Sequence, residues 1–126
     1  MFNRVTINWV QGEHVFALNL GELRALQESC DAGPELVLAR LTSGAWRVDD
    51  VVEVLRLGLI GAGMPASQAG PLVAKACAQV PLLQLRTPAS AVLSAALAGD
   101  AKDMPGKPAG VSPPAGSSPA STEQAP

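Results

Sequence analysis

The chain has 126 residues, a formal net charge of −2 and 48% hydrophobic residues. Its nine basic side chains are scattered and outnumbered by eleven acidic ones, so no basic field is available to bind the phosphate backbone of a nucleic acid. The longest uncharged run, residues 57–74, is interrupted by glycine and proline, so we expect no membrane-spanning segment either.

The composition changes near Asp100. Residues 100–126 consist mostly of proline, glycine, alanine and serine, and Met104 and Val111 are the only sizeable apolar side chains among them. Ordering one residue costs about 1–2 kcal/mol, which so few apolar groups cannot offset. We therefore expect one domain over residues 1–99 and a disordered tail over residues 100–126.

The start of the chain predicts a β-hairpin. Residues 4–10 alternate apolar and polar side chains, which is typical of a half-buried strand. A short turn at residues 11–13 and an apolar run at residues 15–18 complete the pattern. Because two strands alone are marginally stable, helices are expected to cover one face of the hairpin.

Two helices are predicted to follow the hairpin. Asn19 and Glu22 have the spacing of a capping box, which marks the start of the first helix. Gly33 is expected to end it in the left-handed conformation, and Pro34 then opens a second helix at its first position. This second helix should end near Gly44.

Residues 47–63 predict the central helix of the domain. Charged side chains recur at helical spacing in its first half, opposite an apolar stripe, whereas its second half is apolar all round, which is typical of a helix surrounded by other elements. Asp49 or Asp50 is expected to cap its start. Gly61 and Gly63 are expected to let the chain leave the helix with positive φ.

Two more helices complete the domain. For residues 64–80, Pro71 leaves two starts open: near Pro65 with a distortion at Pro71, or at Pro71 itself. Residues 82–86 are interpreted as a connector, and Thr87 and Pro88 as the start of a last helix that ends at Gly99. The predicted fold class is α+β, an N-terminal β-hairpin followed by a bundle of four to five short helices.

Residues suited to catalysis or metal binding are scarce. The one histidine, His14, lies at the hairpin, where an exposed imidazole is expected, and helix capping explains the adjacent carboxylates Asp49 and Asp50. Cys30 and Cys77 lie far apart and are expected to be reduced, buried thiols. We therefore expect a non-enzymatic protein with no catalytic, cofactor or metal site. The N-terminus lacks the features of a signal peptide, which indicates a cytoplasmic protein.

Three segments carry a resemblance to a known family. They read Leu-Asn-Leu-Gly-Glu-Leu-Arg-Ala-Leu-Gln-Glu at residues 18–28, Asp-Val-Val-Glu-Val-Leu-Arg-Leu-Gly-Leu at residues 50–59 and Ala-Gly-Pro-Leu-Val at residues 69–73. With the hairpin before them and a short apolar helix after them, the pattern resembles the small tail-assembly protein of gene transfer agents and related siphophage-like tails, over about residues 4–98. Gly58, Pro71 and the proline-rich tail depart from the family pattern.

The resemblance implies a tail assembly chaperone that keeps the tape measure protein soluble while tail tube subunits polymerise around it. The alternative is a homo-oligomeric structural tail subunit, such as a tail tube protein, but a tube needs a continuous ring of β-structure and only two strands are predicted. The partners implied are the tape measure protein or other tail proteins, and further copies of this chain in the case of a homo-oligomer. The expected binding surface is the exposed part of the helical layer, which would mask apolar helical segments of the partner by helix-in-groove packing. The candidate residues are Leu57, Leu59, Ile60, Leu72 and Val73.

Overall fold

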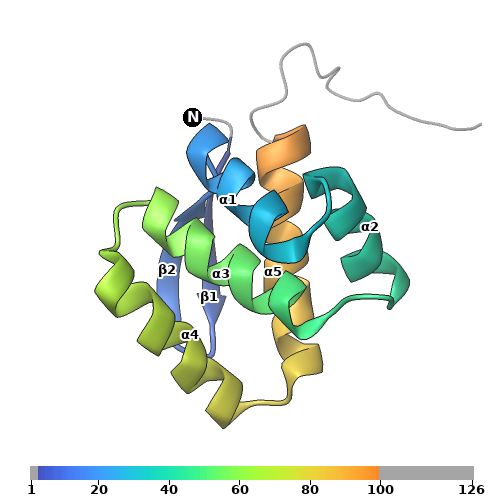
Figure 1. Cartoon of the computed structure of the whole chain (residues 1–126). Helices are drawn as coiled ribbons and strands as arrows, with labels where there is room; N and C mark the ends of the chain where they lie inside the picture. The colour runs from blue at the N-terminus through green and yellow to red at the C-terminus, as the bar shows by residue number, and fades with distance from the viewer. Residues whose placement is uncertain (1–2, 100–126) are drawn as a thin grey trace, which may run out of the picture.

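A computed structural model describes residues 3–99, and the predicted disordered tail at residues 100–126 lies outside the described residues. The elements are β1 (Arg4–Trp9), β2 (Gly12–Ala17), α1 (Leu20–Cys30), α2 (Pro34–Ser43), α3 (Val48–Gly61), α4 (Ala66–Gln79) and α5 (Leu82–Ala98). Figure 1 shows the hairpin packed against the helices. The predicted α+β class is confirmed.

β1 and β2 form an antiparallel pair with Arg4 opposite Ala17 and Trp9 opposite Gly12. The turn between them has only two residues, so it is tighter than the turn predicted at residues 11–13. Gly12 has a φ of +96°, a conformation that glycine adopts without strain, and this lets strand pairing resume directly after the turn. The apolar residues of β1 lie on the face that packs against the core.

α3 is the central helix, as predicted. It packs against α1, α4, α5 and β2, and in Figure 1 it runs across the middle of the molecule. Its buried side chains lie on more than one side of its axis because other elements surround it. They include Val51, Val54, Leu55, Leu57 and Leu59.

The ends of the first two helices follow local chemistry, with one correction. The Glu22 carboxylate accepts a hydrogen bond of 3.0 Å from the Asn19 backbone N–H, so α1 starts where predicted. Its left-handed cap is Asp31, with a φ of 52°, and not Gly33. Aspartate tolerates this conformation because its short polar side chain can hydrogen-bond locally. Gly33 instead precedes α2 in an extended conformation, and Pro34 opens that helix as predicted.

Two prolines lie inside helices. α4 begins at Ala66 and contains Pro71, which selects the first of the two predicted starts. α5 begins at Leu82 and contains Pro88, so the predicted connector at residues 82–86 and the predicted start at Thr87 are wrong. Leu82 and Leu85 pack in or against the core, and this burial offsets the backbone hydrogen bond that a helix loses at proline.

The glycines at the end of α3 have different roles. Gly63 has a φ of +115°, as predicted for a residue that leaves the helix. Gly61 is still helical, so the positive φ predicted for it is wrong; its missing Cβ permits a close approach instead. A Cβ at Gly61 would lie 1.8 Å from the Ala17 carbonyl oxygen. Gly58 lies against Phe16 and Val92 in the same way, but there the contacts are to side chains.

Glu53 and Arg56 form an ion pair on α3. Two hydrogen bonds join them, of 3.0 Å from Nε to Oε2 and 2.7 Å from Nη2 to Oε1. The hydrogen bonds from Arg56 lower the pKa of the Glu53 carboxyl. The pair therefore stabilises the fold fully at pH values above the ordinary carboxyl pKa. This contribution is lost as the pH falls through the lowered pKa of Glu53 in the folded state. The free energies of unfolding of the wild type and Glu53→Gln, measured against pH, should differ most above the ordinary carboxyl pKa and converge below the lowered pKa.

Candidate partner-binding groove

The five residues proposed for partner binding do not form an exposed patch. Leu57, Leu59 and Val73 are buried core residues, so the predicted exposure is wrong for these three. Ile60 and Leu72 are partly buried and pack against the same core. Leu57 and Leu59 are buried because α1, α4, α5 and β2 pack around α3, and Val73 is buried where α4 packs against α3.

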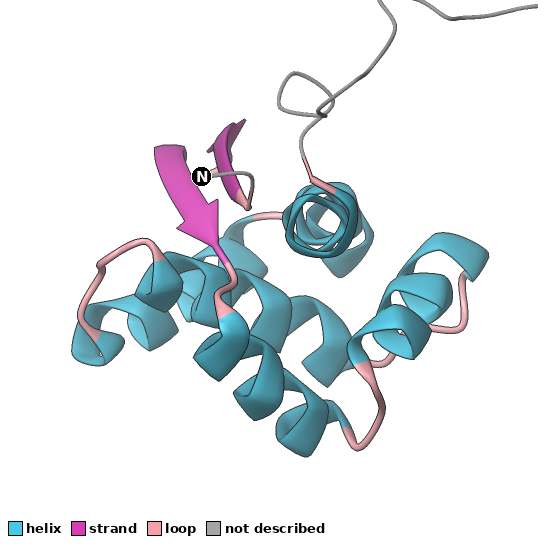
Figure 2. Cartoon of the chain, turned by 90° about the horizontal axis from the view of Figure 1, so that it is seen from above, coloured by secondary structure: helices cyan, strands magenta, loops and turns pink. Residues whose placement is uncertain are grey.

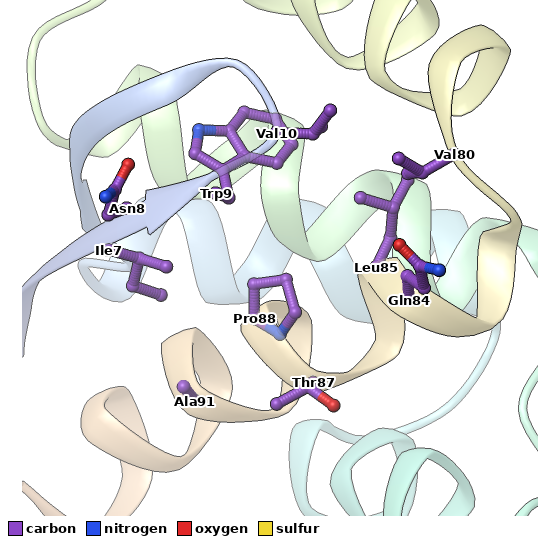
Figure 3. Close-up of a pocket in the computed structure, with 10 residues that line it drawn as sticks. All are labelled: Ile7, Asn8, Trp9, Val10, Val80, Gln84, Leu85, Thr87, Pro88 and Ala91. Atoms are coloured by element: carbon purple, nitrogen blue, oxygen red, sulfur yellow. The ribbon is translucent and has the colours of Figure 1, made fainter.

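A groove with an uncharged lining lies elsewhere, between the end of β1 and the first half of α5 (Figure 3). Its volume is about 360 Å³. No lining residue is charged, and most are apolar, which is typical of a surface that accepts apolar groups. The lining residues are Ile7, Asn8, Trp9, Val10, Val80, Gln84, Leu85, Thr87, Pro88 and Ala91.

The wall on the β1 side is held in place by Trp9. Its indole Nε1–H donates a hydrogen bond of 3.0 Å to Nδ1 of His14, and its ring packs edge-on against Phe16 with 5.5 Å between the ring centroids. Accepting this bond requires that Nδ1 of His14 carry no proton. The half-buried His14 therefore orients the groove wall, and the exposed imidazole predicted from the sequence is wrong.

The wall on the α5 side contains the proline in the helix. Figure 3 shows Ile7 and Pro88 pointing into the space between β1 and α5. Pro88 has no N–H, so the carbonyl of Gln84, four residues earlier, lacks its usual helical partner. A carbonyl oxygen with free acceptor capacity thus accompanies the apolar lining. The sequence gives no signal for this wall, because Thr87 and Pro88 are typical of a helix start and not of a helix interior.

A buried ionic cluster lies away from the groove, where α1, α2 and α3 meet. Asp50 is fully buried, and its Oδ1 lies 2.9 Å from Nη2 of Arg40. The same Nη2 donates a 3.2 Å hydrogen bond to the Cys30 carbonyl oxygen, and Oδ2 of Asp50 accepts a 2.9 Å bond from the Arg47 backbone N–H. Asp50 thus caps α3 from a position inside the first turn of the helix. Of the two predicted caps, Asp49 and Asp50, it is the second. The cluster joins the three helices.

The Cys30 thiol beside this cluster is not a reactive group. Burial, followed by the neighbouring Asp50 carboxylate, raises its pKa to about 12. The thiol is therefore protonated at neutral pH and is neither a good nucleophile nor a good metal ligand. Within residues 3–99, no group of three or more His, Cys, Asp or Glu side chains could hold a metal ion. No helix in the same range is long and apolar enough to cross a membrane.

The family described as "Phage tail tube protein, GTA-gp10" matches residues 3–99, which includes both strands, all five helices of that range and the whole groove. No curated protein and no solved structure matches the chain.

Proposed function

Because the chain belongs to the phage tail tube protein family GTA-gp10, and so to the proteins of phage and gene-transfer-agent tails, we propose that it is a tail assembly chaperone that binds the tape measure protein. This role is non-enzymatic and takes place in the bacterial cytoplasm, where the tail is assembled.

The uncharged groove beside α5 is the observation that carries this proposal. A chaperone must cover apolar segments of its partner before assembly and release them afterwards. The groove offers apolar side chains from two walls, and Val10 at its rim is 40% exposed. Each Å² of apolar surface removed from water contributes about 25 cal/mol, so a partner segment placed here gains affinity without a buried charge. The entropic cost of ordering the bound segment offsets part of this gain, which keeps such binding reversible.

The family description favours a second function, a homo-oligomeric tail tube subunit. A tube wall requires strands that pair between neighbouring subunits all round a ring. Within residues 3–99 the sheet has two strands, and helices make up most of the fold, which supports the chaperone. The two functions differ in what they assemble with: the chaperone binds a different protein, whereas the tube subunit binds copies of itself.

Co-expression tests the two functions against each other. The full chain would be produced with the tape measure protein of the same tail, and the soluble fraction analysed by affinity capture and size-exclusion chromatography. We expect a soluble complex that does not form when this chain is omitted. Rings or tubes formed by this chain alone, with the tape measure protein left insoluble, would favour the structural subunit instead.

Replacing Val10 by glutamate should weaken the complex by at least about tenfold, because a charge would enter an uncharged apolar groove. The matched control is Leu97→Glu, since Leu97 is also 40% exposed but does not line the groove. The control should bind within about twofold of the wild type, a difference of well under 1 kcal/mol. Equal losses for both variants would assign the effect to general surface charge and remove the groove as the binding site. Titration of the purified proteins gives the dissociation constants.

A further inference from the structure

The pairing of the hairpin leaves one side of β1 without partners. Trp9 and Gly12 flank the two-residue turn and form a hydrogen-bonded pair, and such pairs alternate with pairs whose backbone groups point outward. The N–H and C=O groups of Thr6 and Asn8 therefore point away from β2. Among residues 3–99, β2 is the only strand paired with β1, so these outward groups have no strand partner.

This edge lacks the features that usually block strand addition. Natural edge strands are often protected by proline, by a β-bulge or by charged side chains. β1 has no proline, its six residue pairs follow one another without a bulge, and its only charged residue is Arg4 at the far end from the groove. The end of β1 that carries Asn8 is open to a further strand.

The groove lies where the side chains of such a strand would pack. α5 is the helix that packs against β1, and Figure 2 shows α5 end-on beside the hairpin. Alternate side chains of an added strand point to the same face, so every second one would enter the space between β1 and α5. That space is lined by Ile7 and Trp9 on one side and Pro88 and Ala91 on the other.

We propose that β1 binds an extended, uncharged segment of a tail protein as a third strand, with its alternate apolar side chains in the groove. This inference rests on the proposed function, and it specifies that the partner offers a strand here and not a helix. The outward backbone groups of Thr6 and Asn8 supply the hydrogen bonds, as in other cases of strand addition. Because the groove lining has no charged residue, a charged segment would be desolvated without compensation.

A second copy of this chain fits the edge less well. Pairing β1 with β1 of another copy in the antiparallel direction creates a two-fold axis normal to the sheet. The two-fold axis places both α5 helices on the same side of the joint sheet. Each α5 would then lie beneath the β1 of the other copy, in space that the other copy's α5 already occupies. A single extended segment has no such helix and leaves α5 in place.

Proline substitution tests the backbone hydrogen bonds directly. In the full chain, Asn8→Pro removes one outward N–H from β1, and proline is tolerated at a strand edge that faces solvent. Glu13 lies directly opposite Asn8, so Glu13→Pro removes the matching outward N–H from the far edge of β2 and serves as the control. With the tape measure protein as the probe, Asn8→Pro should weaken binding by at least about tenfold and Glu13→Pro by less than about threefold.

Hydrogen exchange of the wild-type chain provides a measurement that needs no variant. The Thr6 and Asn8 amides should exchange rapidly in the free protein and become protected in the complex, whereas the Ile7 amide, paired with β2, is protected in both states. If the wild type binds but neither amide gains protection and Asn8→Pro binds normally, strand addition is wrong and the proposed function stands. If the wild type forms no complex, the proposed function fails. If these amides are protected in the free chain and dilution removes the protection, a second copy is the occupant. If deletion of residues 100–126 removes it, the chain's own tail is the occupant, and either result overturns the proposal.

Discussion

Replacing Gly61 by alanine should lower the free energy of unfolding by about 3–5 kcal/mol, at the upper end of single substitutions. A Cβ at this position would lie 1.8 Å from the Ala17 carbonyl oxygen, far inside van der Waals contact. The obstacle is backbone at the end of β2, so no rotamer change relieves it. α3 would have to move away from the hairpin, and the 3.2 Å hydrogen bond from Asn19 Nδ2 to the Gly61 carbonyl oxygen would be lost with it.

Gly21→Ala is the control for this prediction. Gly21 lies inside α1, and a Cβ there would meet no atom within 4 Å beyond its chain neighbours. Alanine favours the helix over glycine by up to about 1 kcal/mol, so this variant should be as stable as the wild type or slightly more stable. Urea unfolding followed by circular dichroism gives both values. Similar stabilities for the two variants would mean that α3 does not need its close approach to β2.

The sequence predicts helix ends well where a residue interacts with its own neighbours. Asn19 with Glu22 and Pro34 at a first helical position act within one turn, and the structure places α1 and α2 accordingly. The prediction fails at Pro88, where the local rule starts a helix at proline. The burial of Leu85 extends α5 toward the N-terminus, and this burial depends on elements far away in the chain.

The proposed binding groove is less visible in the sequence than the fold, for a related reason. The apolar second half of α3 correctly indicated a surrounded helix, but the sequence does not say which of its sides the other elements leave free, and they leave none at Leu57 or Leu59. The groove combines residues 7–10 with residues 80–91. Because these segments meet only in the folded protein, no periodic pattern in either segment marks the groove.

Asp50 shows the same limit at a single residue. Its position at a helix start predicts the capping of α3 and nothing further. The ion pair with Arg40 on α2 is a tertiary contact that no local spacing indicates. The adjacent Asp49 has the same chemistry but is exposed, so the two carboxylates that looked equivalent in the sequence have different energetic roles.

Replacing Asp50 by alanine should therefore lower the free energy of unfolding by about 3–5 kcal/mol, the usual cost of removing one partner from a buried ion pair. The variant leaves the Arg40 guanidinium, 14% exposed, without its carboxylate, and it leaves the Arg47 N–H without its acceptor. Asp49→Ala is the matched control and should cost less than about 1 kcal/mol, because an exposed carboxylate at a helix start contributes only through the helix dipole and weak capping.

A double-mutant cycle separates the ion pair from the other contacts of Asp50. Arg40→Ala alone leaves the fully buried Asp50 carboxylate without its ion-pair partner, so it should also be strongly destabilising. The double variant should lose less than the sum of the single variants, by about 0.5–3 kcal/mol, because the second substitution removes the charge that the first left unpaired. Additive losses in urea unfolding would mean that Asp50 stabilises the junction of the three helices through its cap on α3 alone.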